Sequence, residues 1–149
     1  MKILLYPNNL LRQESLEVDK FDDELCKFTS LLAEEMYAHH GVGIAALQVG
    51  INKRIIIVDA NADKDDSFPL VMVNPRIIES SGNVTSREGC LSIPDVRGDV
   101  LRSKNIVVEY QTVSGEKLTL NADGLQSNVI QHEIDHLDGV LFIDKIKKP

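Results

Sequence analysis

The residues of this chain most suited to chemistry are His132 and His136, which lie four positions apart, and Glu133 between them. On an α-helix of 3.6 residues per turn the two histidines are separated by about 40°, so both imidazoles can face one ion. Glu133 falls on the flank of that face, where it can reach a metal-bound water without being a ligand itself. This spacing predicts half of a metal site with a general base beside it.

Apolar residues upstream of the histidines support the metal interpretation. Leu125 and Val129 lie seven and three positions before His132, which predicts a helix with the histidines on its buried stripe. A lone histidine on such a face is usually an ordinary core residue. Two at this spacing, with a carboxylate between them, are hard to satisfy without an ion. We therefore expect a metal-binding helix that packs into the core.

A catalytic site of this kind usually has three protein ligands and a water, so a third ligand must come from elsewhere in the chain. Cys90, in a polar stretch bounded by glycine, is the best candidate because of its softness and its surroundings. Spacing alone does not exclude Glu79, Glu88 or Asp135. Such a metal would lower the pKa of its water and polarise a carbonyl, while Glu133 would carry the proton. The implied chemistry is hydrolysis of an amide or a related acyl group.

A second helix is expected near the N-terminus, where Asp19 or Asp22 can cap it and Gly41 can end it. Its apolar residues recur at helical spacing, at Phe21, Leu25, Phe28, Leu32 and Met36. Cys26 falls inside this pattern and is expected to be a small core residue. His39 and His40 are adjacent and point in different directions, so we expect surface positions for them.

The rest of the chain has the composition of strands and connecting segments. Strands are expected at residues 54–59, 70–73, 76–79, 105–111 and 117–120, the last two forming a hairpin about Ser114 and Gly115. Residues 7–17 are expected to form a wrapping arm, and 145–149 a short basic tail. These elements predict one α+β domain over residues 1–149, with mixed or antiparallel sheets packed around a central metal-binding helix.

Composition narrows the partners and the compartment. A net charge of −7 disfavours nucleic acid, because most of the surface would repel a phosphate backbone. No apolar run approaches the roughly 20 residues that span a bilayer, so no membrane association is expected. Two cysteines are too few for a disulfide framework and fit a reducing compartment. Without a signal or transit pattern after Met1, a cytoplasmic location is expected.

Three stretches of the sequence together resemble the signature motifs of the peptide deformylase family. They are Gly-Val-Gly-Ile-Ala-Ala-Leu-Gln at 41–48, Glu-Gly-Cys-Leu-Ser at 88–92 and Gln-His-Glu-Ile-Asp-His at 131–136. Their order and separations also fit, and residues 54–59 and 123–125 are similar to connecting segments typical of that family. The resemblance covers nearly the whole chain. One such motif would be weak evidence, whereas three in register are specific.

The resemblance implies an enzyme that removes the formyl group from the N-terminal formylmethionine of nascent polypeptides and releases formate. By position, Cys90, His132 and His136 would hold one divalent metal ion. In the family this ion is usually ferrous iron, Fe(II), with zinc, nickel or cobalt as substitutes. A thiolate and two imidazoles do not by themselves select iron over zinc.

The same resemblance assigns the catalytic residues. Metal-bound water would be the nucleophile and Glu133 the general acid/base, while Gln48 and the backbone N–H of Leu91 would donate to the oxyanion. Substrate would be bound by Val42, Gly43, Gly89, Leu125 and Val129, the glycines allowing close approach of the peptide. Ser86 and Asn128 stand where family members often carry apolar residues.

Partners and alternatives complete the expectations. The nascent formylmethionyl polypeptide is the expected partner, and the protein is expected to be a monomer. We expect only a transient ribosome contact, because the sequence stops soon after residue 144, whereas many bacterial members continue into a longer C-terminal helix implicated in ribosome docking. A zinc endopeptidase would also use His132, Glu133 and His136, but no downstream His or Glu could be its third ligand. A non-catalytic binding module would be signalled by loss of Glu133, Cys90 or Gln48, all of which are present.

Overall fold

The computed structural model describes residues 1–147 of the chain. Two α-helices, α1 (Asp23–Ala38) and α2 (Gly124–Leu137), alternate with strands and three short 3-10 helices: η1 (Asn9–Arg12), η2 (Ala46–Val49) and η3 (Phe142–Asp144). The strands are β1 (Gly43–Ala45), β2 (Ile55–Val58), β3 (Leu70–Ser81), β4 (Val84–Cys90), β5 (Ile93–Arg102), β6 (Asn105–Gln111) and β7 (Lys117–Asp123). No helix within 1–147 is long and apolar enough to cross a bilayer.

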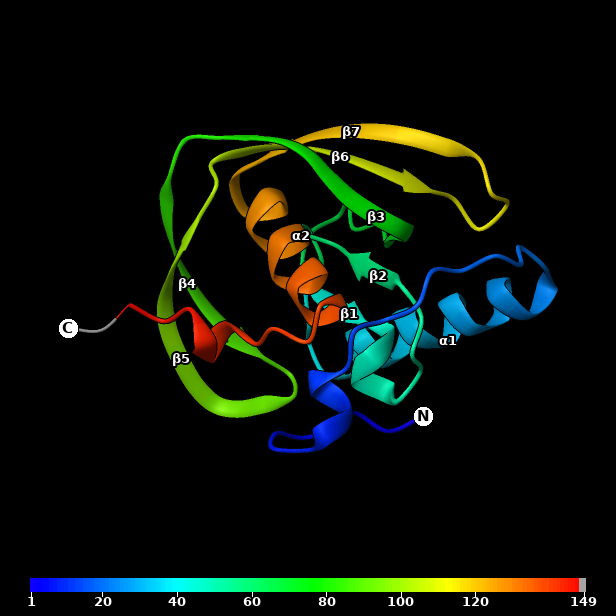
Figure 1. Cartoon of the computed structure of the whole chain (residues 1–149), viewed down its shortest axis with the longest axis horizontal. Helices are drawn as coiled ribbons and strands as arrows, with labels where there is room; N and C mark the ends of the chain where they lie inside the picture. Colours follow the sequence, from blue (N-terminus) through cyan, green and yellow to red (C-terminus); the bar gives the residue numbers. More distant parts are fainter. Residues whose placement is uncertain (148–149) are drawn as a thin grey trace.

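A five-stranded antiparallel sheet in the order β1-β2-β3-β6-β7 separates the two helices. Alternation along β2 explains its four consecutive buried β-branched residues. Ile56 packs in one cluster with Ile130 and Ile134 of α2, whereas Ile57 packs in another with Leu32 of α1. The sheet therefore has a helix on each face, and α2 lies at the centre of the molecule (Figure 1).

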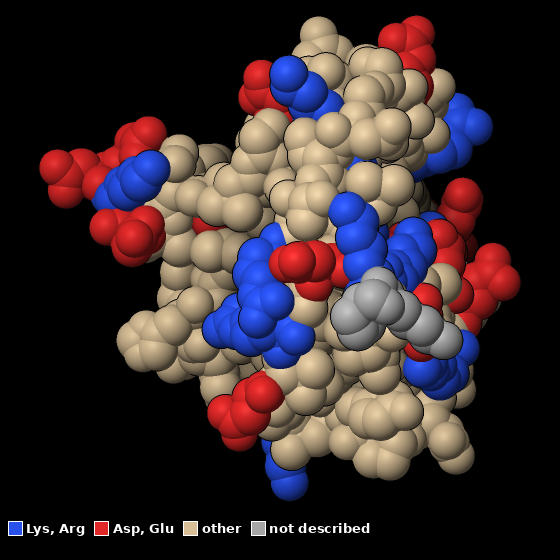
Figure 2. All heavy atoms as spheres, turned by 90° about the vertical axis from the view of Figure 1, so that its left-hand side faces the viewer, with Lys and Arg blue, Asp and Glu red and all other residues tan. Residues whose placement is uncertain are grey.

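The β4–β5 hairpin covers the other side of α2, at the left of Figure 1. Its own cluster joins Ile93 and Val100 of β5 to Phe142 of η3 and Leu11 of the N-terminal arm. After η3 the chain runs back along β5, where Ile146 forms an antiparallel bridge with Val100. Figure 2 shows this face, on which basic and acidic side chains lie next to one another.

The expected elements are largely confirmed, with corrections. The α+β class, the hairpin of β6 and β7 and the helix α2 are as predicted, although β7 continues to Asp123. The two strands expected at 70–73 and 76–79 are one strand, β3, with a register irregularity between Val73 and Arg76. Asn74 lies there at φ 51°; its side-chain Oδ1 accepts from the Val18 N–H at 2.8 Å, and its Nδ2 donates to the Val18 carbonyl at 2.9 Å. Strands β4 and β5 were not expected.

Two expectations about burial were wrong. Cys26 is exposed rather than a core residue, because the buried face of α1 runs through Leu25, Leu32 and Met36 and position 26 falls about 100° away from position 25. Leu125 is 53% exposed rather than interior, because it stands in the first turn of α2. His39 and His40 are exposed, as predicted. The expected basic tail is described only to residue 147, and its last two residues lie outside the described part.

Residues 7–17 form a wrapping arm, as expected, and the structure places this arm against the C-terminal end of α2. The Ser15 N–H donates to the Leu137 carbonyl at 2.7 Å, and Leu11 is fully buried in the cluster beneath the hairpin. Gly139 touches this arm, since a Cβ there would lie 2.5 Å from the Arg12 carbonyl oxygen. These contacts hold the C-terminal end of α2 in place and so help to position its histidines along β4.

Candidate metal centre

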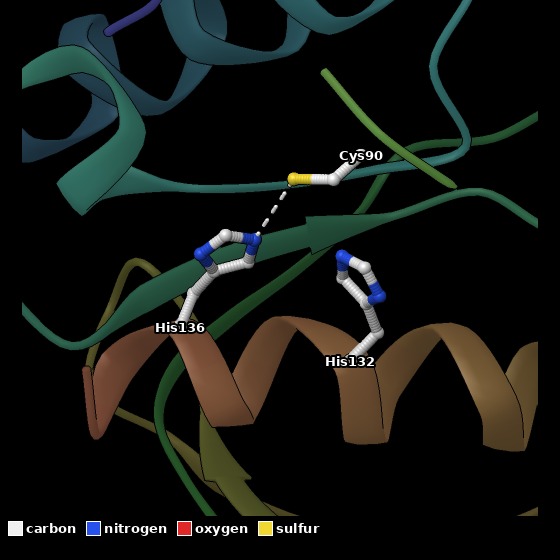
Figure 3. Close-up of side chains that lie close together, drawn as sticks. All are labelled: Cys90, His132 and His136. Atoms are coloured by element: carbon white, nitrogen blue, oxygen red, sulfur yellow. Dashed lines mark hydrogen bonds between the residues drawn. The ribbon is translucent and has the colours of Figure 1, made fainter. Parts of the chain in front are cut away.

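Three side chains from two elements converge beside α2. The Cys90 sulfur, at the end of β4, lies within 4.8 Å of nitrogen atoms of His132 and His136 on α2 (Figure 3). Cys90 Sγ is 3.3 Å from His136 Nε2. Both histidines are buried, and they share one face of the helix because they are four residues apart. The structure therefore places Cys90, the preferred candidate for the third ligand, beside the two histidines.

The ring nitrogens are arranged as ligands would be. His132 Nδ1 is 2.9 Å from Glu88 Oε1, which leaves Nε2 for the site. His136 directs Nε2 toward Cys90, and its buried Nδ1 has no hydrogen-bond partner among residues 1–147. A thiolate and two imidazoles, one oriented by a carboxylate, are a donor set that divalent transition metals accept with a position left open. The residues present fit a metal ion.

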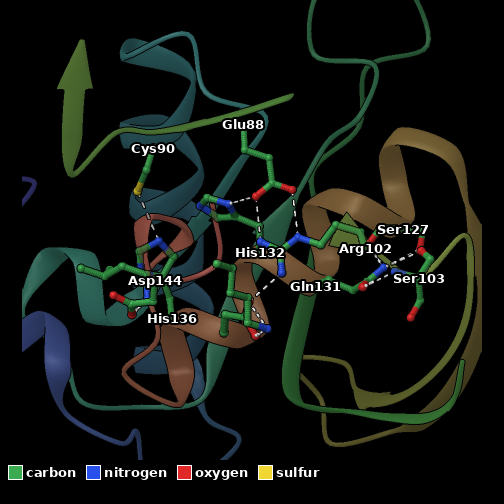
Figure 4. Close-up of polar contacts among 12 residues, drawn as sticks. Glu88, Cys90, Arg102, Ser103, Ser127, Gln131, His132, His136 and Asp144 are labelled. Carbon is green, nitrogen blue, oxygen red and sulfur yellow. Dashed lines mark hydrogen bonds and ion pairs between the residues drawn. The ribbon is translucent and has the colours of Figure 1, made fainter. Parts of the chain in front are cut away.

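The other ligand candidates either form ion pairs with basic side chains, as Glu88 and Asp135 do, or are exposed, as Glu79 is. Glu88 accepts from Arg102 Nε and Nη2 at 2.9 and 2.7 Å, and Arg102 Nη1 reaches Asp135 at 2.7 Å (Figure 4). Asp135 also pairs with Lys145 at 3.1 Å. Glu79 lies on the exposed end of β3. Of the four candidates, the structure brings only Cys90 to the histidines as a direct neighbour with a free donor atom.

Electrostatics of the site follow from burial and from these pairs. Burial opposes the charge of Glu88, but hydrogen bonds from Arg102 and His132 outweigh it and lower the pKa of Glu88 to about 2. For His132, burial lowers the pKa, but contacts with Cys90, Glu133 and Glu88 outweigh it and raise the pKa to about 10. The pocket therefore favours one positive charge at this point, a requirement that a bound cation also meets.

Glu133 is the other charged group at the centre. It is 4% exposed, and its Oε1 has no hydrogen-bond partner in the described part of the chain. Burial raises the pKa of Glu133 to about 7. A carboxyl with a pKa near neutrality can both accept and return a proton at physiological pH. Its Oε2 would lie 2.5 Å from a Cβ built on Gly43, so β1 and α2 approach closely only because position 43 is glycine.

Gln48 lies on the opposite wall and is held in one orientation. It is 1% exposed; its Oε1 accepts from the Ala45 N–H at 2.9 Å, and its Nε2 donates to Ser92 Oγ at 3.1 Å. The same Nε2 is 3.7 Å from Cys90 Sγ. Leu91 follows Cys90 in the turn between β4 and β5. Gln48 and Leu91 therefore both line the cleft next to the thiol.

A cleft of about 570 Å³ opens onto this centre. The residues predicted to bind substrate all line it: Val42, Gly43, Gly89, Leu125 and Val129. A Cβ on Gly89 would collide with the Arg97 guanidinium, so a side chain there would have to displace it. Sequence reasoning missed Arg102, whose partners lie 14 and 33 positions away, and no local pattern signals such pairs.

Replacing Glu88 with glutamine should weaken metal binding by about 10- to 100-fold, because His132 would lose the carboxylate that orients its ring and raises its basicity. The measurement is a competitive titration of Zn(II) against a chromophoric chelator. Glu109→Gln is the matched control, since Glu109 pairs with Arg76 at 2.9 Å on the exposed surface. Equal affinities in the two variants would contradict the orienting role of Glu88.

Comparison with known proteins finds the same family along the whole chain. The family model described as polypeptide deformylase matches residues 1–149. A peptide deformylase of Pelagibacter ubique is 45% identical over 148 residues, covering 98% of this chain and 86% of the relative. One of Brucella suis is 44% identical over 147 residues, covering 98% and 84%.

Solved structures are similar as well. A peptide deformylase from Thermotoga maritima superposes with a TM-score of 0.92 at 38% identity, covering 99% of this chain and 97% of that one. One from Synechococcus elongatus, in complex with actinonin, has a TM-score of 0.95 at 40% identity, covering 99% and 80%. With the whole sequence matched by the family model and the fold shared with solved members, this chain belongs to the peptide deformylase family of metal-dependent hydrolases.

Proposed function

We propose that this enzyme removes the formyl group from the N-terminal formylmethionine of nascent polypeptides and releases formate, using one divalent ion held by Cys90, His132 and His136. Members of its family remove N-formyl groups from nascent peptides. The observation that carries the proposal for this chain is the convergence of the three ligand atoms within 4.8 Å beside the buried carboxyl of Glu133. Residues 1–149 would act as one catalytic domain.

Glu133 would move the proton during hydrolysis. When bound, the ion supplies Lewis-acid chemistry, lowering the pKa of a water and polarising the formyl carbonyl. Glu133 would accept a proton from the attacking water as the water oxygen bonds to the formyl carbon. It would then pass this proton to the amine nitrogen as the carbon–nitrogen bond breaks. A pKa of about 7, raised by burial, suits both directions of this transfer.

Gln48 and the backbone N–H of Leu91 would stabilise the oxyanion that forms at the formyl oxygen. Two observations support this role. Both residues line the cleft, and the Gln48 side-chain amide is held in one orientation because its Oε1 accepts a hydrogen bond from the Ala45 N–H. Donors that are already oriented lose no freedom as charge develops. Removal of one such donor typically lowers the rate by about 10²- to 10³-fold.

The peptide would bind along two strand edges. In their sheets β1 pairs only with β2 and β4 only with β5 among the described strands, so each has an edge without a strand partner. Both strands line the cleft through Gly43 and Gly89, which carry no side chain. An extended peptide can add to such edges by main-chain hydrogen bonds. Val42, Leu125 and Val129 would then contact the first side chain.

For the native ion we propose Fe(II), with zinc, nickel or cobalt as substitutes, on the strength of the three motifs. The ligands of the site accept all of these metals. For the protein we propose a cytoplasmic monomer that meets the nascent chain with a transient ribosome contact and does not bind nucleic acid directly. The net charge of −7 supports the last point.

Formate release from a short N-formyl-methionyl peptide tests the proposal. The protein is purified without oxygen and loaded in parallel with Fe(II), Ni(II) and Zn(II). We expect turnover with iron or nickel well above that with zinc, and loss of turnover after chelation. An unformylated peptide serves as the second substrate, because a zinc endopeptidase would cleave it internally. Absence of formate with every metal, in folded and loaded protein, would refute the assigned reaction.

A further inference from the structure

The metal centre is part of a longer face shared by β4 and α2. Cys90 lies against His136, and Glu88 against His132, at 3.3 and 2.9 Å. Two residues of a strand cover about 6.6 Å and four residues of a helix about 6 Å, so the two elements advance together. The next step along both is the pair Ser86 and Asn128. Both line the cleft, one step beyond the metal ligands.

Both residues of this third pair are polar, and the side chain of one of them, Asn128, lacks a hydrogen-bond partner for its oxygen among the described residues. Asn128 Oδ1 is buried and has no hydrogen-bond partner anywhere in residues 1–147. Ser86 is 7% exposed, and it lines the same cleft. Buried polar groups without partners are costly and are usually completed by water or a ligand. Because Asn128 lines the cleft, bound substrate is the natural source of a partner for it.

We propose that Asn128 and Ser86 select the first side chain of the substrate, so that the enzyme accepts formyl peptides whose first residue has the length of methionine and a polar end, methionine sulfoxide in particular. This rests on the proposed deformylation. Oxidation turns the weakly accepting thioether of methionine into a sulfoxide, whose oxygen is a strong acceptor. The Ser86 hydroxyl can donate to it, and so can the Asn128 amide, because a half-turn of that group exchanges its oxygen and nitrogen.

The test compares kcat/KM for three peptides that differ only in the first residue: formyl-methionine, formyl-methionine sulfoxide and formyl-norleucine. Norleucine has the length of methionine without any hydrogen-bonding atom. Asn128→Leu keeps the approximate shape of the side chain and removes its polarity, and Ser86→Ala removes only the hydroxyl. Asn121→Leu, on the exposed face of β7, is the matched control for the same chemical change.

We divide kcat/KM for the methionine sulfoxide peptide by kcat/KM for the norleucine peptide. This ratio should fall by about tenfold or more in Asn128→Leu, because a buried hydrogen bond to the sulfoxide is lost. Ser86→Ala should shift it the same way, which keeps the test valid if Asn128→Leu does not fold by circular dichroism. Asn121→Leu should leave it unchanged. An equal ratio in the unmutated protein and both cleft variants would overturn the selection while leaving deformylation intact. Failure to release formate from any of the three peptides would instead overturn the proposed function, and the selection with it.

Discussion

Replacing Glu133 with alanine should reduce kcat/KM for a formyl-methionyl peptide by about 10²- to 10⁴-fold, the range for loss of a general acid/base. The metal should remain bound, because Cys90, His132 and His136 are untouched and Glu133 is on the flank of the site. Formate release gives the rate, and elemental analysis of dialysed protein gives the metal content. The pairing of lost turnover with retained metal separates proton transfer from ligation.

Stability gives this experiment its internal check. Glu133 is buried with an unpartnered oxygen, so its removal should not lower the free energy of unfolding by as much as loss of a paired group would. Glu116→Ala, in the exposed turn after β6, is the matched control and should retain full turnover. Activity in Glu133→Ala within tenfold of the unmutated enzyme would sink the proposed mechanism.

Replacing Arg102 with methionine should lower the free energy of unfolding by about 3–5 kcal/mol, the usual effect of breaking a buried ion pair by removing one partner. The Arg102 side chain is 2% exposed and lies between Glu88 and Asp135, at 2.7 Å from each. Its removal would leave the Glu88 carboxylate buried against His132 without its strongest partner. Urea denaturation in the presence of a chelator measures the effect apart from metal binding.

A matched variant shows what burial contributes. Arg76 makes an ion pair of 2.9 Å with Glu109, but its side chain is 72% exposed. Arg76→Met should therefore cost at most about 1 kcal/mol, as exposed pairs do. Combining Arg102→Met with Glu88→Gln should recover part of the loss, since the buried charge is then gone. Similar losses in Arg76→Met and Arg102→Met would contradict the structural role assigned to Arg102.

Local patterns predicted the parts of the site that depend on local geometry. The spacing of His132 and His136 was sufficient for α2, because helical periodicity alone places both rings on one face. It could not choose among Cys90, Glu79, Glu88 and Asp135, because the choice depends on how β4 lies against the helix. The pairing of Glu88 with Arg102 settles this for Glu88, and it spans elements that no short window of sequence contains.

The failures in the fold have the same origin. Strand β5 escaped prediction because four consecutive residues near its start, 94–97, are exposed and its burial does not alternate regularly. Its partners come from both ends of the chain, through Leu11 and Phe142. Strand β3 continues through Asn74 with only a register irregularity, and two hydrogen bonds with the backbone of Val18, 56 positions away, hold the Asn74 side chain there. In each case contacts distant in sequence outweighed the local propensity.

The return of the chain along β5 also bears on how copies of this protein avoid one another. An uncovered strand edge offers N–H and C=O groups to the strands of other molecules and so promotes aggregation. Here Ile146 bridges Val100, and the Lys147 N–H donates to the Asp99 carbonyl at 2.8 Å. Gly98 leaves room for Ile146, since a Cβ there would lie 2.6 Å from its Cδ1. The middle of β5 is thus closed to intermolecular sheet growth by the protein's own chain.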